Sequence, residues 1–89
     1  MKLLVVGAGE MGRWLADTVD ADVAFTDADP AVAEAAADPR AARAVPSDTA
    51  ESFDAVGVAV PMSVVDEAIA TYAPLAETAV FDISGVMDR

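Results

Sequence analysis

Three glycines near the N-terminus have the spacing that suits a bound phosphate group. Gly7, Gly9 and Gly12 fit the pattern G-x-G-x-x-G, after a short apolar run and before a helical pattern. In that context Gly7 would make a tight turn, Gly9 would let a pyrophosphate approach the backbone, and Gly12 would let helix and strand pack closely. The amides of Glu10 and Met11, at the positive end of the helix dipole, would donate to the phosphate. We therefore favour dinucleotide binding over a purely structural turn.

An acidic residue follows at the distance expected for ribose recognition. Asp27 stands twenty residues after Gly7, at the end of the next predicted strand, and Ala28 follows it in the same loop. A carboxylate there would accept hydrogen bonds from the adenosine ribose hydroxyls and would repel the 2′-phosphate of NADP. No lysine or arginine occurs from Ala28 to Pro39 to offset that repulsion. These residues predict NAD rather than NADP, although Asp27 has an alternative role as a turn cap, like the cap expected of Asp29 before its helix.

Two further segments are expected at the same edge of the sheet, because ligands of such folds bind at the carboxyl ends of the strands. Ala59, Val60 and Pro61 end one predicted strand, and Ser84 follows the last one. Pro61 has no amide hydrogen and would direct the chain over the nicotinamide, while the Ser84 hydroxyl would lie near the reactive ring. Ordinary loop chemistry is the alternative for both segments.

The alternation of apolar runs and breakers defines the elements that would position these residues. Strands are predicted at 3–6, 22–26, 55–60 and 78–83, with a weak strand at 42–45. Helices are predicted at 10–19, 29–37 and 63–72, and a short helical turn at 47–52. Strands separated by helices indicate right-handed βαβ units and a parallel sheet. The predicted fold is a single α/β domain over 1–89, a Rossmann-type doubly wound parallel sheet of about five strands in the order 3-2-1-4-5, with helices on both faces.

Three local signals mark the starts of the later helical segments. Asp29 followed by proline predicts a capped helix. Asp48 and Glu51 have the spacing of a capping pair for the short turn. Ser63-x-x-Asp66 would open the last helix. The residues expected to face inward from that helix are Val64, Val65, Ala68 and Ile69.

Composition excludes several kinds of function. The 89 residues include no cysteine and no histidine, so there is no disulfide, no thiolate or imidazole metal site and no histidine base. Sixteen acidic against five basic residues give a formal charge of −11, which argues against a nucleic-acid partner. Apolar runs are too short to span a membrane, and the start of the chain is unlike a signal peptide, so a cytoplasmic protein is expected. Arg13, one turn into the first helix, could reach a phosphate, but we favour a solvated helix face.

The acidity itself has two readings. Most of the acidic residues are aspartates, and Lys2 is the one lysine of the chain. Such a surface suits a salt-rich cytoplasm, where dense counterions screen the repulsion between like charges. An ordinary acidic protein from a GC-rich genome is the alternative.

Three segments together resemble a known family. Residues Gly7 to Trp14, Val58 to Pro61 and Asp82 to Val86 resemble the N-terminal cofactor domain of prephenate dehydrogenases, with the nearest likeness to archaeal forms, and the aspartate content suggests a haloarchaeal one. The resemblance implies oxidative decarboxylation of prephenate to 4-hydroxyphenylpyruvate in tyrosine biosynthesis, with hydride passed to NAD or NADP. The family's catalytic histidine and arginine lie in later segments and in a helical dimerisation domain. This chain thus resembles only the cofactor half of a homodimeric enzyme that acts on a small-molecule substrate, and alone it is expected to be inactive.

One segment departs from the family, and other families share parts of the motif set. Many prephenate dehydrogenases have D-x-x-S-V-K after the fifth strand, whereas here Gly85 takes the serine position, Met87 takes the lysine position, and Ser84 stands one residue early. Pyrroline-5-carboxylate reductases and 3-hydroxyacid dehydrogenases share some of the segments. The regulatory nucleotide-sensing domains of potassium transport systems resemble the chain in the glycine motif and the acidic residue. Those domains generally lack a segment like that at Pro61.

Overall fold

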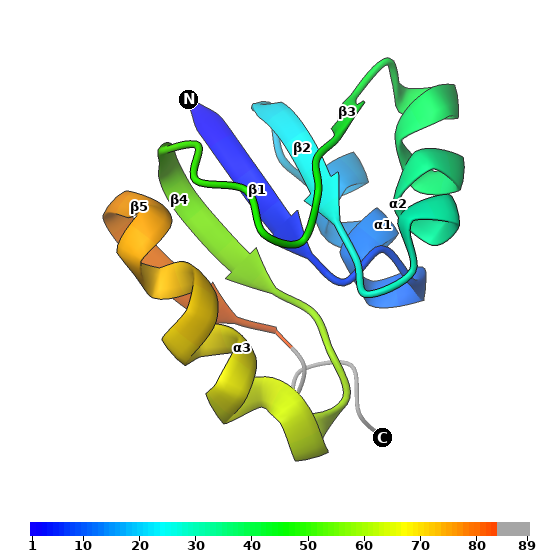
Figure 1. Cartoon of the computed structure of the whole chain (residues 1–89). Coiled ribbons are helices and arrows are strands. Elements are labelled where there is room, and N and C mark those ends of the chain that lie inside the picture. The colour runs from blue at the N-terminus through cyan, green and yellow to red at the C-terminus, as the bar shows by residue number, and fades with distance from the viewer. Residues whose placement is uncertain (84–89) are drawn as a thin grey trace.

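The computed structural model describes residues 1–83, in which helical segments separate successive strands except the third and fourth, which an irregular connection joins (Figure 1). The strands are β1 (Lys2–Val6), β2 (Asp22–Thr26), β3 (Arg43–Ala44), β4 (Phe53–Val58) and β5 (Ala76–Asp82). The α-helices are α1 (Glu10–Thr18), α2 (Pro30–Ala37) and α3 (Val65–Tyr72), and the 3-10 turns are η1 (Asp38–Arg40), η2 (Met62–Val64) and η3 (Ala73–Leu75). No helix in this part of the chain is long and apolar enough to cross a membrane.

The five strands form one parallel sheet in the order β3-β2-β1-β4-β5, which confirms the predicted fold class and strand order. The central strand β1 pairs on one side with β2, where Leu3 is opposite Val23, and on the other with β4, where Leu3 is opposite Ala55. Because all strands run the same way, their carboxyl ends lie together at one edge of the sheet, here called the carboxyl edge (Figure 1). The strand order reverses between β1 and β4, and this is where such folds bind ligands.

Helices cover the sheet on both faces, as predicted, because alternate residues of β1 point to opposite sides. Leu3 and Val5 face α1 and α2, where small alanines of α2 let the helix approach the sheet closely. Leu4 and Val6 face the side of α3, where Ala68, Ile69 and Tyr72 pack against them and their neighbours in β4. Burying each such leucine or valine contributes about 1.5–3 kcal/mol.

The start of α2 is built as its sequence predicts. The Asp29 carboxylate accepts a hydrogen bond of 3.0 Å from the amide of Ala31, and Pro30 occupies the first helical position. A cap of this kind is worth about 1 kcal/mol. The weak strand expected at 42–45 exists as the two residues of β3.

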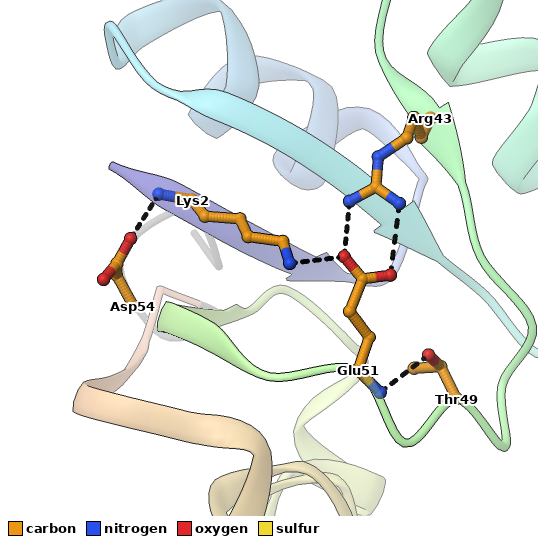
Figure 2. Close-up of polar contacts among 5 residues, drawn as sticks. All are labelled: Lys2, Arg43, Thr49, Glu51 and Asp54. Atoms are coloured by element: carbon orange, nitrogen blue, oxygen red, sulfur yellow. Dashed lines mark hydrogen bonds and ion pairs between the residues drawn. The ribbon is translucent and has the colours of Figure 1, made fainter.

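The predicted helical turn at 47–52 is wrong. The segment that joins β3 to β4, here called the β3–β4 connection (residues 45–52), is irregular apart from a turn in which the Thr49 amide donates to the Pro46 carbonyl at 3.0 Å. Asp48 and Glu51 do not form a capping pair. The Glu51 carboxylate is held by Lys2 and Arg43 from the neighbouring strands, and these ion pairs replace the local contacts that a helical turn would need (Figure 2).

Two element boundaries also differ from prediction. Strand β4 begins and ends two residues earlier than expected, because Phe53 is fully buried and pairs with Ala76, whereas the chain leaves the ladder before Pro61. Strand β5 likewise begins two residues earlier than its predicted start.

The start of α3 differs as well. Helix α3 begins at Val65, after a 3-10 turn and without a side-chain cap from Ser63. Val65 is buried, but Val64 is 40% exposed and does not face inward as predicted. The 3-10 turn η2 rotates Val64 away from the face that it would have occupied in a longer helix.

Candidate functional site

The residues that the sequence singles out meet in one cavity at the carboxyl edge. It has a volume of about 1000 Å³ and lies where β1, β2 and β4 end. Nine of the predicted site residues line it: Gly7, Gly9, Glu10, Met11, Asp27, Ala28, Ala59, Val60 and Pro61. Gly12 lies behind it, in the packing between α1 and β1, and Ser84 falls outside the described residues together with the departures at Gly85 and Met87. Distant parts of the sequence are thus brought together as predicted.

Two of the three motif glycines are required by the fold itself. Gly7 has a φ of +99°, which disfavours a side chain, and a Cβ there would lie 2.2 Å from the Ala59 carbonyl oxygen. A Cβ on Gly12 would lie 1.9 Å from the Gly7 carbonyl oxygen, so the close approach of α1 to the end of β1 depends on that glycine. Both positions therefore shape the site without needing a ligand to explain them.

Gly9 differs from the other two. Its φ of −79° is open to any residue, and a Cβ at this position would meet nothing within 4 Å among residues 1–83. Gly9 lines the cavity at the start of α1, so that missing side chain leaves room beside the first amides of the helix. No side chain of residues 1–83 caps this helix, and its first turn is the positive end of the helix dipole. The arrangement can accept an anion against the backbone.

Asp27 is already engaged with the backbone around it. One carboxylate oxygen accepts from the Ala8 amide at 2.8 Å, and the other accepts from the Asp29 amide at 2.9 Å. The turn role that the sequence left as an alternative is therefore present. A carboxylate can accept about four hydrogen bonds, so two bonds leave it able to accept from a ribose diol as well.

Arg13 is held close to the glycine loop, defined here as residues 7–9. Its Nε donates to the Ala8 carbonyl at 3.2 Å, so the expected solvated position of this side chain is wrong in part. The fixed geometry of a guanidinium makes such a contact to a single carbonyl oxygen directional.

Sequence reasoning missed the far wall of the cavity. It is formed by α3, by the turn before it, by the β3–β4 connection and by the end of β1, and the residues are Val6, Ser47, Met62, Val64, Glu67, Ala68, Thr71 and Tyr72. The Tyr72 hydroxyl donates to the Ser47 carbonyl at 2.8 Å and joins helix and connection across this wall. The position of Ser47 shortly after a strand could have indicated that it lies at the cavity. A strand of only two residues gives a weak sequence pattern, so this signal was missed.

Ion pairs anchor the β3–β4 connection beside the sheet. Figure 2 shows Glu51 between Lys2 and Arg43: Lys2 Nζ lies 2.6 Å from Glu51 Oε2, and Arg43 donates to both carboxylate oxygens at 3.1 and 2.7 Å. The Lys2 amide also donates to the Asp54 carboxylate at 2.7 Å. Hydrogen bonds from Arg43, and then from Lys2, lower the pKa of Glu51 from 4.5 to about 2. The connection that carries Ser47 is thus attached through charged side chains.

The charged side chains that line the cavity within residues 1–83 are all negative. Three carboxylates line it, from Glu10, Asp27 and Glu67, and no lysine or arginine does among residues 1–83. A bound phosphate must therefore be attracted by backbone amides, and each additional negative charge on a ligand is opposed by the lining. The site suits an anion of modest charge with hydroxyl groups near Asp27.

Solved structures with the same fold include several dehydrogenases. Myo-inositol dehydrogenase from Lactobacillus casei, in complex with NAD(H) and myo-inositol, is 30% identical over 92% of this chain, with a TM-score of 0.70. Shikimate 5-dehydrogenase from Thermus thermophilus, in complex with NADP(H) and shikimate, is 27% identical over 93% of this chain, with a TM-score of 0.72. Prephenate dehydrogenase from A. aeolicus, in complex with hydroxyphenyl propionate and NAD+, is 20% identical over 92% of this chain, with a TM-score of 0.73.

The chain has a Rossmann-type fold. It spans 27%, 34% and 32% of the lengths of those three proteins, respectively. No protein-family model matches it, and no curated protein matches it. The similarity supports a nucleotide-binding fold shared with NAD(P)-dependent dehydrogenases, and it extends across dehydrogenases that act on different substrates.

Proposed function

We propose that residues 1–89 form the NAD-binding domain of an oxidoreductase. The observation that carries the proposal is Gly9, because nothing in residues 1–83 explains its missing side chain and the space opens into the cavity. A pyrophosphate is the group for which such a space is needed, since it must approach the first amides of a helix closely. The likeness to solved dehydrogenases supports the same function.

Each part of the cavity has a role in this proposal. The amides of Glu10 and Met11 donate to the pyrophosphate, and Asp27 accepts from the adenosine ribose with Ala28 beside it. The segment from Ala59 to Pro61 borders the nicotinamide. For Ser84 we keep the role expected from the sequence, a hydroxyl near the reactive ring. When bound, the cofactor supplies hydride transfer, while the protein orients the reactive carbon and excludes water.

We propose NAD rather than NADP as the cofactor. Asp27 lies at the end of β2, and the lining of the cavity provides no basic side chain among residues 1–83 to receive a 2′-phosphate. The additional charge of that phosphate would lie near a carboxylate. Arg13, the nearest arginine in sequence to the glycine loop, is directed to the Ala8 carbonyl.

For the complete protein we propose prephenate dehydrogenase activity, on the basis of the resemblance of the glycine motif, the segment at Val60-Pro61 and the segment at Asp82. The proposal includes a catalytic and dimerisation domain beyond these 89 residues and a cytoplasmic location. It is tested by following NADH formation at 340 nm with prephenate, with myo-inositol and shikimate as comparison substrates. Turnover of prephenate alone is the expected result, and turnover of either comparison substrate without prephenate would reject this assignment.

The cofactor is tested by calorimetric titration of this chain with NAD+ and NADP+. We expect NAD+ to bind at least about tenfold more tightly, since close like charges oppose NADP+. Both affinities should rise between about 0.2 and 2 M KCl, because salt screens the carboxylates around the cavity. Asp27→Ala should weaken NAD+ more than NADP+. Tighter binding of NADP+ by the wild type, or unchanged NAD+ affinity in Asp27→Ala, would reject the proposed ribose contact.

A further inference from the structure

Both backbone groups of Ala8 are bound by charged side chains. Ala8 is fully buried in the middle of the glycine loop. Its amide donates to Oδ2 of Asp27 at 2.8 Å, and its carbonyl accepts from Nε of Arg13 at 3.2 Å. Asp27 lies at the end of β2 and Arg13 lies on α1, so the two contacts reach the loop from different elements.

We propose that Asp27 and Arg13 are positioning residues that hold the glycine loop in the shape that accepts a pyrophosphate. The inference rests on the proposed function and gives Asp27 a second task besides its ribose contact. Gly7 and Gly9 flank Ala8, and glycines leave a chain more conformational freedom than any other residue. Without the two contacts, a ligand would have to order this loop as it binds, and its affinity would fall.

The contacts of Asp27 connect the choice between NAD and NADP with the order of the glycine loop. Asp27 can accept from the ribose and from Ala8 at the same time, because a carboxylate has acceptor positions for both. Its replacement by a residue that tolerates a 2′-phosphate would also remove the bond to Ala8. We therefore expect such a replacement to weaken every ligand that carries a diphosphate, including ligands that lack the ribose hydroxyls.

Two nucleotides separate the loop contact from the ribose contact. ADP has both ribose hydroxyls, whereas 2′,3′-dideoxyadenosine 5′-diphosphate has neither. Asp27→Leu keeps the approximate size of the side chain but has no oxygen that could accept from the Ala8 amide. It should weaken the dideoxy nucleotide roughly fivefold and ADP by a larger factor. If Asp27→Leu leaves the affinity for the dideoxy nucleotide unchanged, Asp27 acts through the ribose alone and the proposal is wrong.

Arg13→Met tests the other contact, and Arg40→Met is the matched control. Arg13 is expected to act on the loop and not on the ribose, so Arg13→Met should weaken both nucleotides by the same factor, roughly threefold. Arg40 pairs with Asp17 on the outer side of α1, with Nε 2.8 Å from the carboxylate, and it does not line the cavity. Arg40→Met should leave both affinities unchanged. Unequal effects of Arg13→Met on the two nucleotides would contradict a role confined to the loop.

Hydrogen exchange of the Ala8 amide tests the positioning role without any ligand. In the wild-type chain this amide should be protected, and Asp27→Leu and Arg13→Met should each speed its exchange by roughly tenfold or more, while Arg40→Met should not. If the wild type binds neither nucleotide but the Ala8 amide is protected as described, the proposed function fails and the loop contacts stand. Fast exchange of this amide in the wild type would overturn the positioning role itself.

Discussion

The glycine loop and the β3–β4 connection both border the cavity and both contact charged side chains, but close backbone packing additionally shapes the glycine loop. In the glycine loop the Gly7 amide donates to the Thr26 carbonyl at 2.8 Å, and the positions of Gly7 and Gly12 leave no space for a Cβ. The β3–β4 connection depends on the ion pairs of Glu51. Substitutions of Gly7 or Gly12 should therefore act through shape, whereas substitutions of Glu51 should act through charge and depend on pH and salt.

The largest effect is expected from Gly12→Ala in α1, where the helix packs against the glycine loop. The new methyl carbon would lie 1.9 Å from the Gly7 carbonyl oxygen, which is backbone and cannot move without disturbing the loop. We expect a loss of about 3 kcal/mol or more in the free energy of unfolding, a large share of the total for a domain of this size. Urea unfolding followed by circular dichroism measures it. A Gly12→Ala chain as stable as the wild type would show that α1 can shift away from β1 at little cost.

A smaller effect on the free energy of unfolding, opposite in sign, is expected from a substitution of Thr26 at the end of β2. The Thr26 side chain is fully buried, and its hydroxyl has no hydrogen-bond partner among residues 1–83. Thr26→Val keeps the branched shape and the carbonyl that binds Gly7 but removes the unpaired hydroxyl, so stability should increase by about 1 kcal/mol. This corresponds to a rise of roughly 4–8 °C in the thermal midpoint. Thr78→Val, at an exposed position of β5, is the control and should change the midpoint little.

If Thr26→Val instead destabilises the chain, the Thr26 hydroxyl has a partner that matters for folding. In that case close packing is not the whole explanation for the structure beside the glycine loop. Calorimetry of the two variants and the wild type in one buffer decides this.

The smallest effect is expected from Glu51→Gln in the β3–β4 connection. This variant should lower the thermal midpoint by a few degrees near neutral pH. Because the pKa of Glu51 is lowered to about 2 in the fold, its ionised form stabilises the chain fully above pH 4.5. That contribution is lost as the pH falls from about 4.5 toward 2, so the difference between wild type and variant should close over this range. It should also shrink in molar KCl.

Glu77→Gln is the matched control for this region, since Glu77 is exposed on β5 and no ion pair of it occurs within residues 1–83. A difference between wild type and Glu51→Gln that does not vary with pH would mean that packing, rather than charge, holds the β3–β4 connection.

The same contrast explains what the sequence could predict. The main strands and nine of the residues around the cavity follow from local patterns, because turn geometry and the period of apolar residues are properties of neighbouring positions. The strand order follows from the doubly wound fold class that these patterns indicate. The structure of residues 47–52 does not, since the partners of Glu51 lie 49 and 8 residues away, at Lys2 and Arg43. For the same reason the sequence could not show that Asp27 binds the amide of Ala8, nor that Tyr72 closes the far wall by binding Ser47.

The most direct test of the proposed function is the pair of unfolding and NAD+ titration experiments on Gly9→Ala. A methyl group at this position meets nothing within 4 Å in the described part of the chain, so the free energy of unfolding should change by no more than about 1 kcal/mol. The same methyl group would occupy space that the pyrophosphate needs, and NAD+ affinity should fall by at least about tenfold. A stable Gly9→Ala chain that binds NAD+ as tightly as the wild type would contradict the proposal that Gly9 marks a pyrophosphate site.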